Sequence, residues 1–146
     1  MGGASRGAAA LVAAVLLGSL AACGGDDDPY CRTIEADQPT LDDFGSTRSN
    51  DAYTKYAATL SSISKVAPAD AKQQWTALAA ATRGVVEAHE QVGFPLEDMR
   101  DADKRQALSE SDAAVLEEAY SVFNDTTDAR QAVVDEVQDA CDIDLK

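Results

Sequence analysis

The sequence predicts an all-α protein: a small helical bundle of three long helices plus short helices, preceded by a cleaved signal segment. Apolar residues recur at alternating three- and four-residue spacing over several long stretches, which is typical of one buried helix face. No stretch alternates apolar and polar residues convincingly, as a half-buried strand would. Residues 29–146 are long enough to form one domain with a real core.

The domain is expected to begin with a short helix over 29–37. Asp28 followed by proline is a typical N-cap and first helical position. Residues 38–50 are predicted to be a connection between helices. Leu41 and Phe44 within this connection are expected to dock onto the core.

Two long helices are predicted next, over 51–67 and 68–92, with Asn50 or Asp51 capping the first. The apolar stripe of the first helix comprises Tyr53, Tyr56, Leu60, Ile63 and Ala67. The stripe of the second comprises Ala71, Trp75, Leu78, Thr82, Val85, His89 and Val92, widened by Ala79 and Val86. Gly93 is a natural stop. So few residues separate the two helices that they should form an antiparallel hairpin.

Residues 97–108 are highly charged and predict a short exposed helix, supported by an Asp101–Arg105 pair at i,i+4. The last helix is predicted over 109–142. Ser109, with an acidic residue three positions later, approximates a capping box at its start.

Residues 124–127 (Asn-Asp-Thr-Thr) form helix poorly, so a kink or break is expected there, although a continuous helix is slightly preferred. Arg130 would intrude on the apolar stripe of a straight helix. It therefore marks the kink or reaches an acid on a neighbouring helix. The two stripes of this helix comprise Ala113, Leu116, Tyr120 and Phe123, then Val133 or Val134, Val137 and Cys141.

Residues 1–22 contain one arginine and an apolar run of about ten residues, which is shorter than the ~20 residues of a membrane-spanning helix. The run ends in Leu-Ala-Ala-Cys at 20–23, which resembles the lipobox of bacterial lipoprotein signal peptides. The resemblance implies that the Cys23 thiol takes a diacylglyceryl group and becomes the mature N-terminus. The protein would then be lipid-anchored at the extracytoplasmic face of the cell membrane. The alternative is an ordinary signal peptide cleaved nearby, with Cys23 a plain thiol.

Lipidation of Cys23 leaves Cys31 and Cys141, which are about 110 residues apart. An exported chain meets an oxidising environment, where two remaining cysteines usually pair, so a Cys31–Cys141 disulfide is expected. Free thiols and metal ligation are the alternatives. The sequence contains no Cys-x-x-Cys, which argues against a metal site.

Residues 23–28 form a short acidic tether after the signal segment. All 26 acidic residues follow residue 22, against 11 basic ones, so the formal charge of the mature chain is −15. A surface this acidic repels nucleic acid phosphates and anionic lipid headgroups. The sequence therefore argues against nucleic acid binding, and it permits a basic partner or a loosely held cation.

His89 is the sole histidine, so any catalysis or metal site that uses histidine depends on it. One hypothesis makes it a metal ligand or general base with clustered carboxylates. The favoured one makes it a hydrogen-bonded histidine at the edge of the bundle. Nucleophile motifs, phosphate-binding loops and calcium loops are absent from the sequence. We therefore expect no cofactor, no metal and no catalytic residue, and we expect the aromatic residues on the helical stripes to be core.

Several features together resemble small secreted lipoproteins of actinobacteria that have no assigned function. They are the lipobox with Cys23, the early Cys31, Val-Ala-Pro-Ala-Asp at 66–70 followed by Trp75, and Cys-Asp-Ile at 141–143. Members commonly finish with Cys-Gly-Ile, so Asp142 is a departure. The resemblance supplies no catalytic residues. It implies a non-enzymatic binding or interaction module of the cell envelope, with an unidentified envelope protein or small ligand as partner. A metal-handling protein or enzyme that uses His89 is the alternative.

Overall fold

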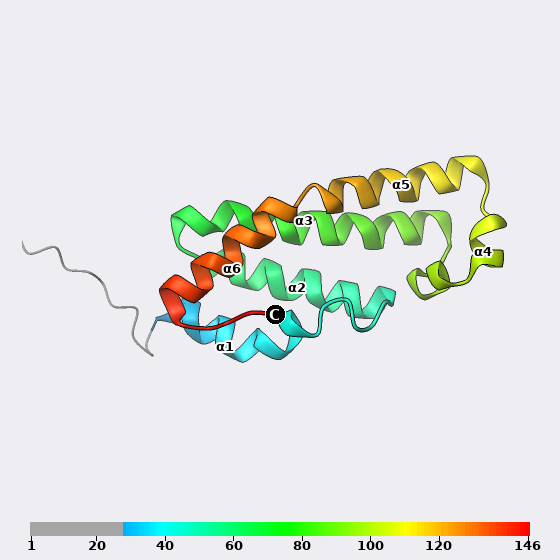
Figure 1. Cartoon of the computed structure of the whole chain (residues 1–146). Coiled ribbons are helices and arrows are strands. Elements are labelled where there is room, and N and C mark those ends of the chain that lie inside the picture. The colour runs from blue at the N-terminus through cyan, green and yellow to red at the C-terminus, as the bar shows by residue number, and fades with distance from the viewer. Residues whose placement is uncertain (1–27) are drawn as a thin grey trace, which may run out of the picture.

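Six α-helices and one 3-10 helix make up the part of the chain that the structure, a computed structural model, describes, residues 28–146 (Figure 1). In order they are α1 (Pro29–Asp42), α2 (Asn50–Val66), α3 (Ala69–Val92), η1 (Leu96–Arg100), α4 (Ala102–Gln106), α5 (Glu110–Asn124) and α6 (Thr127–Cys141). No strand occurs within these residues, and the predicted all-α class is confirmed. The predicted signal segment 1–22, Cys23 and all but the last residue of the tether lie outside the described residues.

Helix α3 is the element on which the others rest. It packs against α2 as an antiparallel hairpin, and α5 and α6 lie end to end along its other side (Figure 1). Helix α1 packs against α2 and touches α6. The predicted stripe of α3 is buried except for Val92, and the helix ends at Gly93 in the left-handed conformation (φ 65°). The continuous 3.6-residue pattern therefore identified the central helix correctly.

The core falls into two clusters along the length of the bundle. The cluster near the end of α1 that carries Pro29 includes Tyr30, Ile34, Leu41, Leu60, Ile63, Ala71, Trp75, Leu78, Ala79, Val133 and Val137. The cluster nearer α4 consists of Tyr53, Ala81, Val85, Val86, Leu96 and Phe123, with Phe44 and Tyr120 packed against it. The first cluster draws on four helices, α1, α2, α3 and α6, so it holds the two ends of the described chain together.

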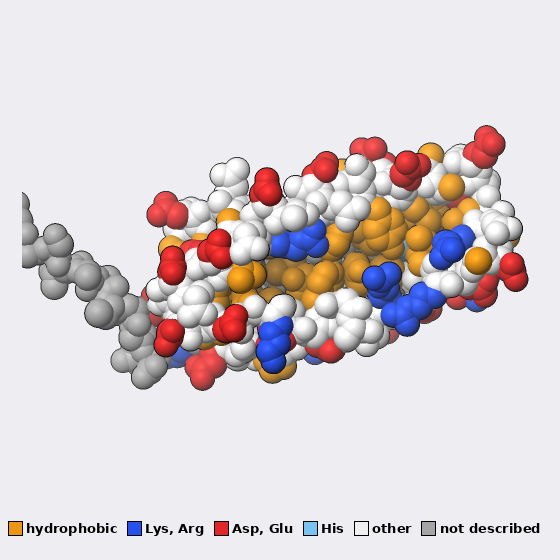
Figure 2. Space-filling model, in the orientation of Figure 1, with side chains coloured by type: hydrophobic (Ala, Val, Ile, Leu, Met, Phe, Trp, Pro, Cys, Tyr) orange, Lys and Arg blue, Asp and Glu red, His pale blue; other side chains and the backbone are white. Residues whose placement is uncertain are grey.

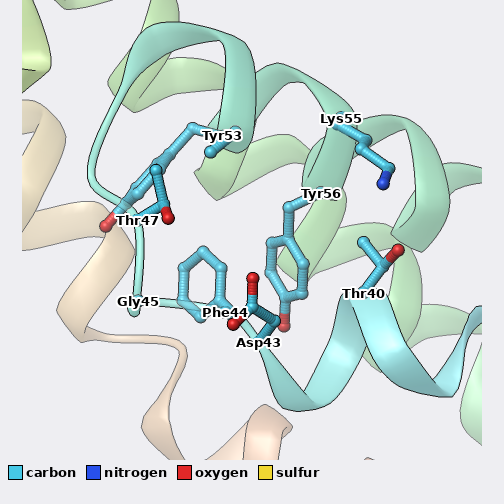
Figure 3. Close-up of a pocket in the computed structure, with 9 residues that line it drawn as sticks. Thr40, Asp43, Phe44, Gly45, Thr47, Tyr53, Lys55 and Tyr56 are labelled. Atoms are coloured by element: carbon cyan, nitrogen blue, oxygen red, sulfur yellow. The ribbon is translucent and has the colours of Figure 1, made fainter.

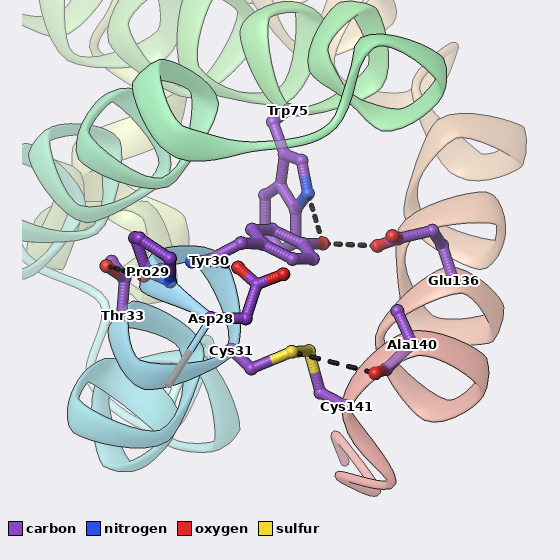
Figure 4. Close-up of a disulfide and its surroundings, with 9 residues drawn as sticks. All are labelled: Asp28, Pro29, Tyr30, Cys31, Thr33, Trp75, Glu136, Ala140 and Cys141. Carbon is purple, nitrogen blue, oxygen red and sulfur yellow. Dashed lines mark hydrogen bonds between the residues drawn. A yellow bond between two sulfur atoms is a disulfide. The ribbon is translucent and has the colours of Figure 1, made fainter. Parts of the chain in front are cut away.

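A disulfide between Cys31 and Cys141 joins the first and last helices (Figure 4). The Cα atoms are 5.3 Å apart, within the usual range for a disulfide. Beside it, the Tyr30 hydroxyl donates to the Glu136 carboxylate and accepts from Trp75 Nε1 at 2.9 Å. Helices α1, α3 and α6 are thus tied at one end by a covalent bond and two hydrogen bonds.

Helix α1 is longer than predicted. Asp28 caps it as expected, accepting from the Tyr30 amide at 2.8 Å, but the helix continues to Asp42 through Pro39. Proline cannot donate to the carbonyl four residues earlier. Leu41 lies two turns beyond Ile34 on the same buried face, and burying it offsets the lost hydrogen bond.

The cap of α2 also differs from the prediction. Ser49 caps it, accepting from the Ala52 amide at 3.2 Å, rather than Asn50 or Asp51. The Asn50 side chain instead accepts from the Leu96 amide at 3.0 Å, a contact between segments far apart in sequence. The prediction that Asn50 caps α2 was therefore wrong, because the hydrogen-bond partner of its side chain lies far away in the sequence.

The predicted single helix over 97–108 is two short elements, η1 and α4. The Asp101–Arg105 pair does not form, because Asp101 is the N-cap of α4 and accepts from two backbone amides. The ion pair joins Lys104 to Asp98 at 2.6 Å instead. Arg105 donates to the Met99 carbonyl.

The last predicted helix is broken, so the preference for a continuous helix was wrong. Ser109 caps α5 as expected, and α5 ends at Asn124. The hydroxyls of Thr126 and Thr127 donate to carbonyls three residues earlier, at 2.7 and 2.8 Å, and so compete with helix continuation. Arg130 lies over the Phe123 ring, 5.1 Å from its centroid. Of its two predicted roles, marking the kink or reaching an acid on a neighbouring helix, this position fits the first.

Replacing both Cys31 and Cys141 by serine should reduce the free energy of unfolding. A loop of 110 residues constrains the unfolded chain by about 4–5 kcal/mol in the chain-entropy model, and less where other contacts hold the ends. Urea denaturation of the oxidised protein and the variant measures the difference, with reduced wild-type protein as control. A loss below about 1 kcal/mol would contradict a framing role for the disulfide.

Glu136 should make stability depend on pH. Burial raises the pKa of its carboxyl, while the hydrogen bond from Tyr30 acts in the opposite direction. A raised pKa in the folded state means that the stabilising contribution is complete at low pH and is lost as pH rises through that pKa. The unfolding free energy of Glu136→Gln minus that of wild type should therefore grow between pH 4 and 7. Glu117→Gln, at an exposed acid on α5, is the matched control. Parallel curves for the two variants would refute the assignment.

Candidate functional site

An apolar groove opens on the face of the bundle where α2 and the α5–α6 row both rest on α3 but pack little on each other. Figure 2 shows it as a continuous hydrophobic strip along the middle of the molecule. Its deepest part has a cavity volume of about 190 Å³. The apolar walls there come from Leu41, Trp75, Leu78, Val133, Val134 and Leu145.

Phe44 forms one edge of this groove. Its ring stacks on Tyr56, with ring centroids 3.8 Å apart and planes 17° apart, and it also approaches Tyr53 and Phe123. Gly45, at φ 87°, turns the chain immediately after Phe44 in a conformation that favours glycine. A smaller hollow of about 70 Å³ lies on the outer side of the stacked pair (Figure 3). The pair therefore separates the two spaces.

Two basic residues, Arg130 and Lys146, line the groove, and neither forms an ion pair among the described residues, where the one ion pair is Lys104–Asp98. Arg130 lines the groove, donates to the Thr127 hydroxyl at 3.0 Å and covers Phe123. Arg48 lies close enough to Tyr53 to oppose the rise in its pKa. Figure 2 shows basic side chains at the edges of the apolar strip and most of the acidic ones farther out.

Tyrosine hydroxyls share this environment. Burial raises the pKa of Tyr56 to about 12, and Arg130 opposes that rise. Burial likewise raises the pKa of Tyr120 to about 12, opposed by Arg48. Both phenols are therefore protonated donors at neutral pH.

His89 is fully enclosed rather than placed in the groove. Its side chain is 1 % exposed, with Nδ1 2.6 Å from the Phe94 carbonyl and Nε2 2.9 Å from the Tyr120 hydroxyl. Because a carbonyl only accepts, the proton lies on Nδ1, and Nε2 accepts from Tyr120. Both nitrogens are occupied by uncharged protein groups, so the geometry does not favour a metal ligand or general base. No group of three metal-ligating side chains gathers anywhere in residues 28–146.

The sequence anticipated part of this site. Trp75 and Tyr56 were assigned to the core, and they also line the groove. Phe44 was expected to dock onto the core, and it does. Arg48 was not singled out, because nothing in its local sequence places it beside an aromatic cluster.

No family model, curated protein or solved structure matches this chain. Of the helices that the structure describes, none has the length and hydrophobicity needed to cross a membrane.

Replacing His89 by alanine should destabilise the fold by about 2–4 kcal/mol, because it opens a cavity and leaves the buried Phe94 carbonyl unpaired. Tyr120→Phe removes one hydrogen bond and should cost about 1 kcal/mol. Chemical denaturation measures both. Unchanged stability of His89→Ala, together with a loss of zinc binding in calorimetry, would instead support the metal-site hypothesis.

Proposed function

We propose that this protein is a lipid-anchored binding module at the extracytoplasmic face of the cell membrane, without enzymatic activity. Cys23 carries the lipid, the acidic tether follows it, and the disulfide-framed bundle presents its groove to a ligand. The particular role in the envelope is defined by that ligand.

The Cys31–Cys141 disulfide is the observation that carries the location. A disulfide that closes most of the domain is expected in an oxidising compartment outside the cytoplasm. The pairing also uses two of the three cysteines and leaves Cys23, which stands at the lipobox-like sequence. The described domain begins five residues after Cys23, so the lipid would hold the bundle close to the membrane.

The open groove supports the binding role. Binding sites are typically concave and mostly apolar, with a few placed polar groups. The groove has apolar walls, with Tyr56, Arg130 and Lys146 among its lining residues. The enclosed His89 offers no comparable access to substrate.

Replacing Cys23 by alanine should release the protein from the membrane. Wild-type protein expressed in a lipoprotein-processing bacterium should incorporate labelled palmitate and sediment with membranes after a high-salt wash. Cys23→Ala should lose the label, because no other thiol stands at the lipobox. The Cys31→Ala/Cys141→Ala pair is the matched control and should keep both label and anchorage. Palmitate incorporation into Cys23→Ala would contradict the proposed anchor.

A further inference from the structure

The groove is lined by both apolar and basic side chains, which limits the class of ligand that it can bind. Its walls are mostly apolar, while Arg130 and Lys146 also line it and Arg130 covers the Phe123 ring. A ligand that satisfied both parts would carry an alkyl chain and one anionic end.

The basic side chains near the groove favour a ligand whose polar end is anionic over one whose polar end is uncharged. The mature chain has 26 acidic residues, yet neither Arg130 nor Lys146 forms an ion pair with one in the described part of the chain. At physiological ionic strength, charges are screened over about 8 Å, so the basic residues that line the groove, Arg130 and Lys146, contribute most to the potential inside it. Guanidinium groups bind carboxylates with two parallel hydrogen bonds, and the Tyr56 hydroxyl is a further donor.

The size of the groove favours a single alkyl chain. The deep part, about 190 Å³, exceeds the ~150 Å³ cavity that suffices for benzene. An α-helix from a protein partner is about 10 Å wide and would not enter it. A single chain can fill the deep part and continue along the apolar strip of Figure 2. Each buried methylene contributes about 0.8 kcal/mol, so a long chain supplies most of the affinity.

We propose that the groove binds a long-chain fatty acid, with its alkyl chain against the half-buried Phe44, Val134 and Leu145 and its carboxylate held by Arg130. The proposal rests on the binding role argued above and names its ligand class. It does not depend on the lipid anchor.

Titration of the full chain carrying Cys23→Ser tests this directly, since the substitution removes acyl groups that would compete for the groove. Trp75 is the sole tryptophan and lines the groove, so its fluorescence reports on occupancy, and calorimetry gives the affinity. Palmitate should bind with micromolar affinity. Hexadecanol should bind more weakly, and acetate and dodecyltrimethylammonium should not bind.

Variants separate the head and tail contacts. Arg130→Gln should weaken palmitate binding about tenfold or more, because a charge-assisted hydrogen bond is lost, and should leave hexadecanol binding unchanged. Val134→Trp, at a half-buried position in the wall, should block both ligands. Arg83→Gln, an exposed arginine on α3 outside the groove, is the matched control and should bind as the parent does. Circular dichroism of each variant verifies that it is folded.

Three outcomes would overturn the proposal: no palmitate binding by the folded protein, equal binding of the cationic amphiphile, or palmitate affinity unaffected by Arg130→Gln and Val134→Trp. Preference for phosphatidylglycerol vesicles over palmitate would also overturn it, in favour of a diacyl lipid. These results test ligand binding and not the membrane location, because the membrane release of Cys23→Ala is measured separately.

Discussion

The Cys31–Cys141 disulfide is the constraint on which the arrangement of the bundle depends. Helix α3 holds α2 on one side and α5–α6 on the other, but α1 has little direct contact with α6. The disulfide and the Tyr30 hydrogen bonds supply that connection. They fix α1 against α6 at one end of the bundle. The residues after α6 then run along α1, where Gln38 donates to the Asp144 carbonyl at 3.3 Å and the Lys146 amide donates to Asp42 at 2.9 Å, and Leu41 and Leu145 line the groove. The covalent frame therefore shapes the candidate site as well as stabilising the domain.

An open face in a helical bundle exposes apolar surface to water, which lowers stability. Here aromatic side chains cover part of that surface. Phe44 enters from the turn between α1 and α2 and stacks on Tyr56, while Phe123 from α5 meets Tyr53 and is covered by Arg130. These rings close the middle of the face and leave a groove beside them. A patch of exposed apolar surface bordered by polar groups commonly marks a binding site.

The helices that could be predicted from the sequence are those with a local, periodic pattern of apolar residues. The stripe of α3 and the glycine that ends it were predicted correctly, because burial on one face imposes a 3.6-residue period. The continuation of α1 through Pro39 was missed, because packing of Leu41 overrides a local helix breaker. The break before α6 was only partly anticipated, since the hydrogen bonds of Thr126 and Thr127 compete closely with helix continuation.

The groove could not be derived in the same way. It exists because three elements fail to close over α3, and the fit between distant helices leaves no periodic signal. The disulfide was predictable because lipidation of Cys23 would leave Cys31 and Cys141 as the one possible pair. This argument needs no knowledge of the three-dimensional structure. Arg130 gains its significance from what surrounds it: the Phe123 ring, the groove, and no ion-pair partner in the described chain.

Mapping palmitate onto the backbone amides by NMR, using the full chain with Cys23→Ser, tests the central claim most directly. The account predicts saturable shifts concentrated at three places: the end of α1 with Phe44, the Trp75–Leu78 turn of α3, and the first two turns of α6. Amides of η1 and α4 should stay unchanged. Shifts spread evenly over the surface, or confined to η1 and α4, would contradict the groove as the ligand site.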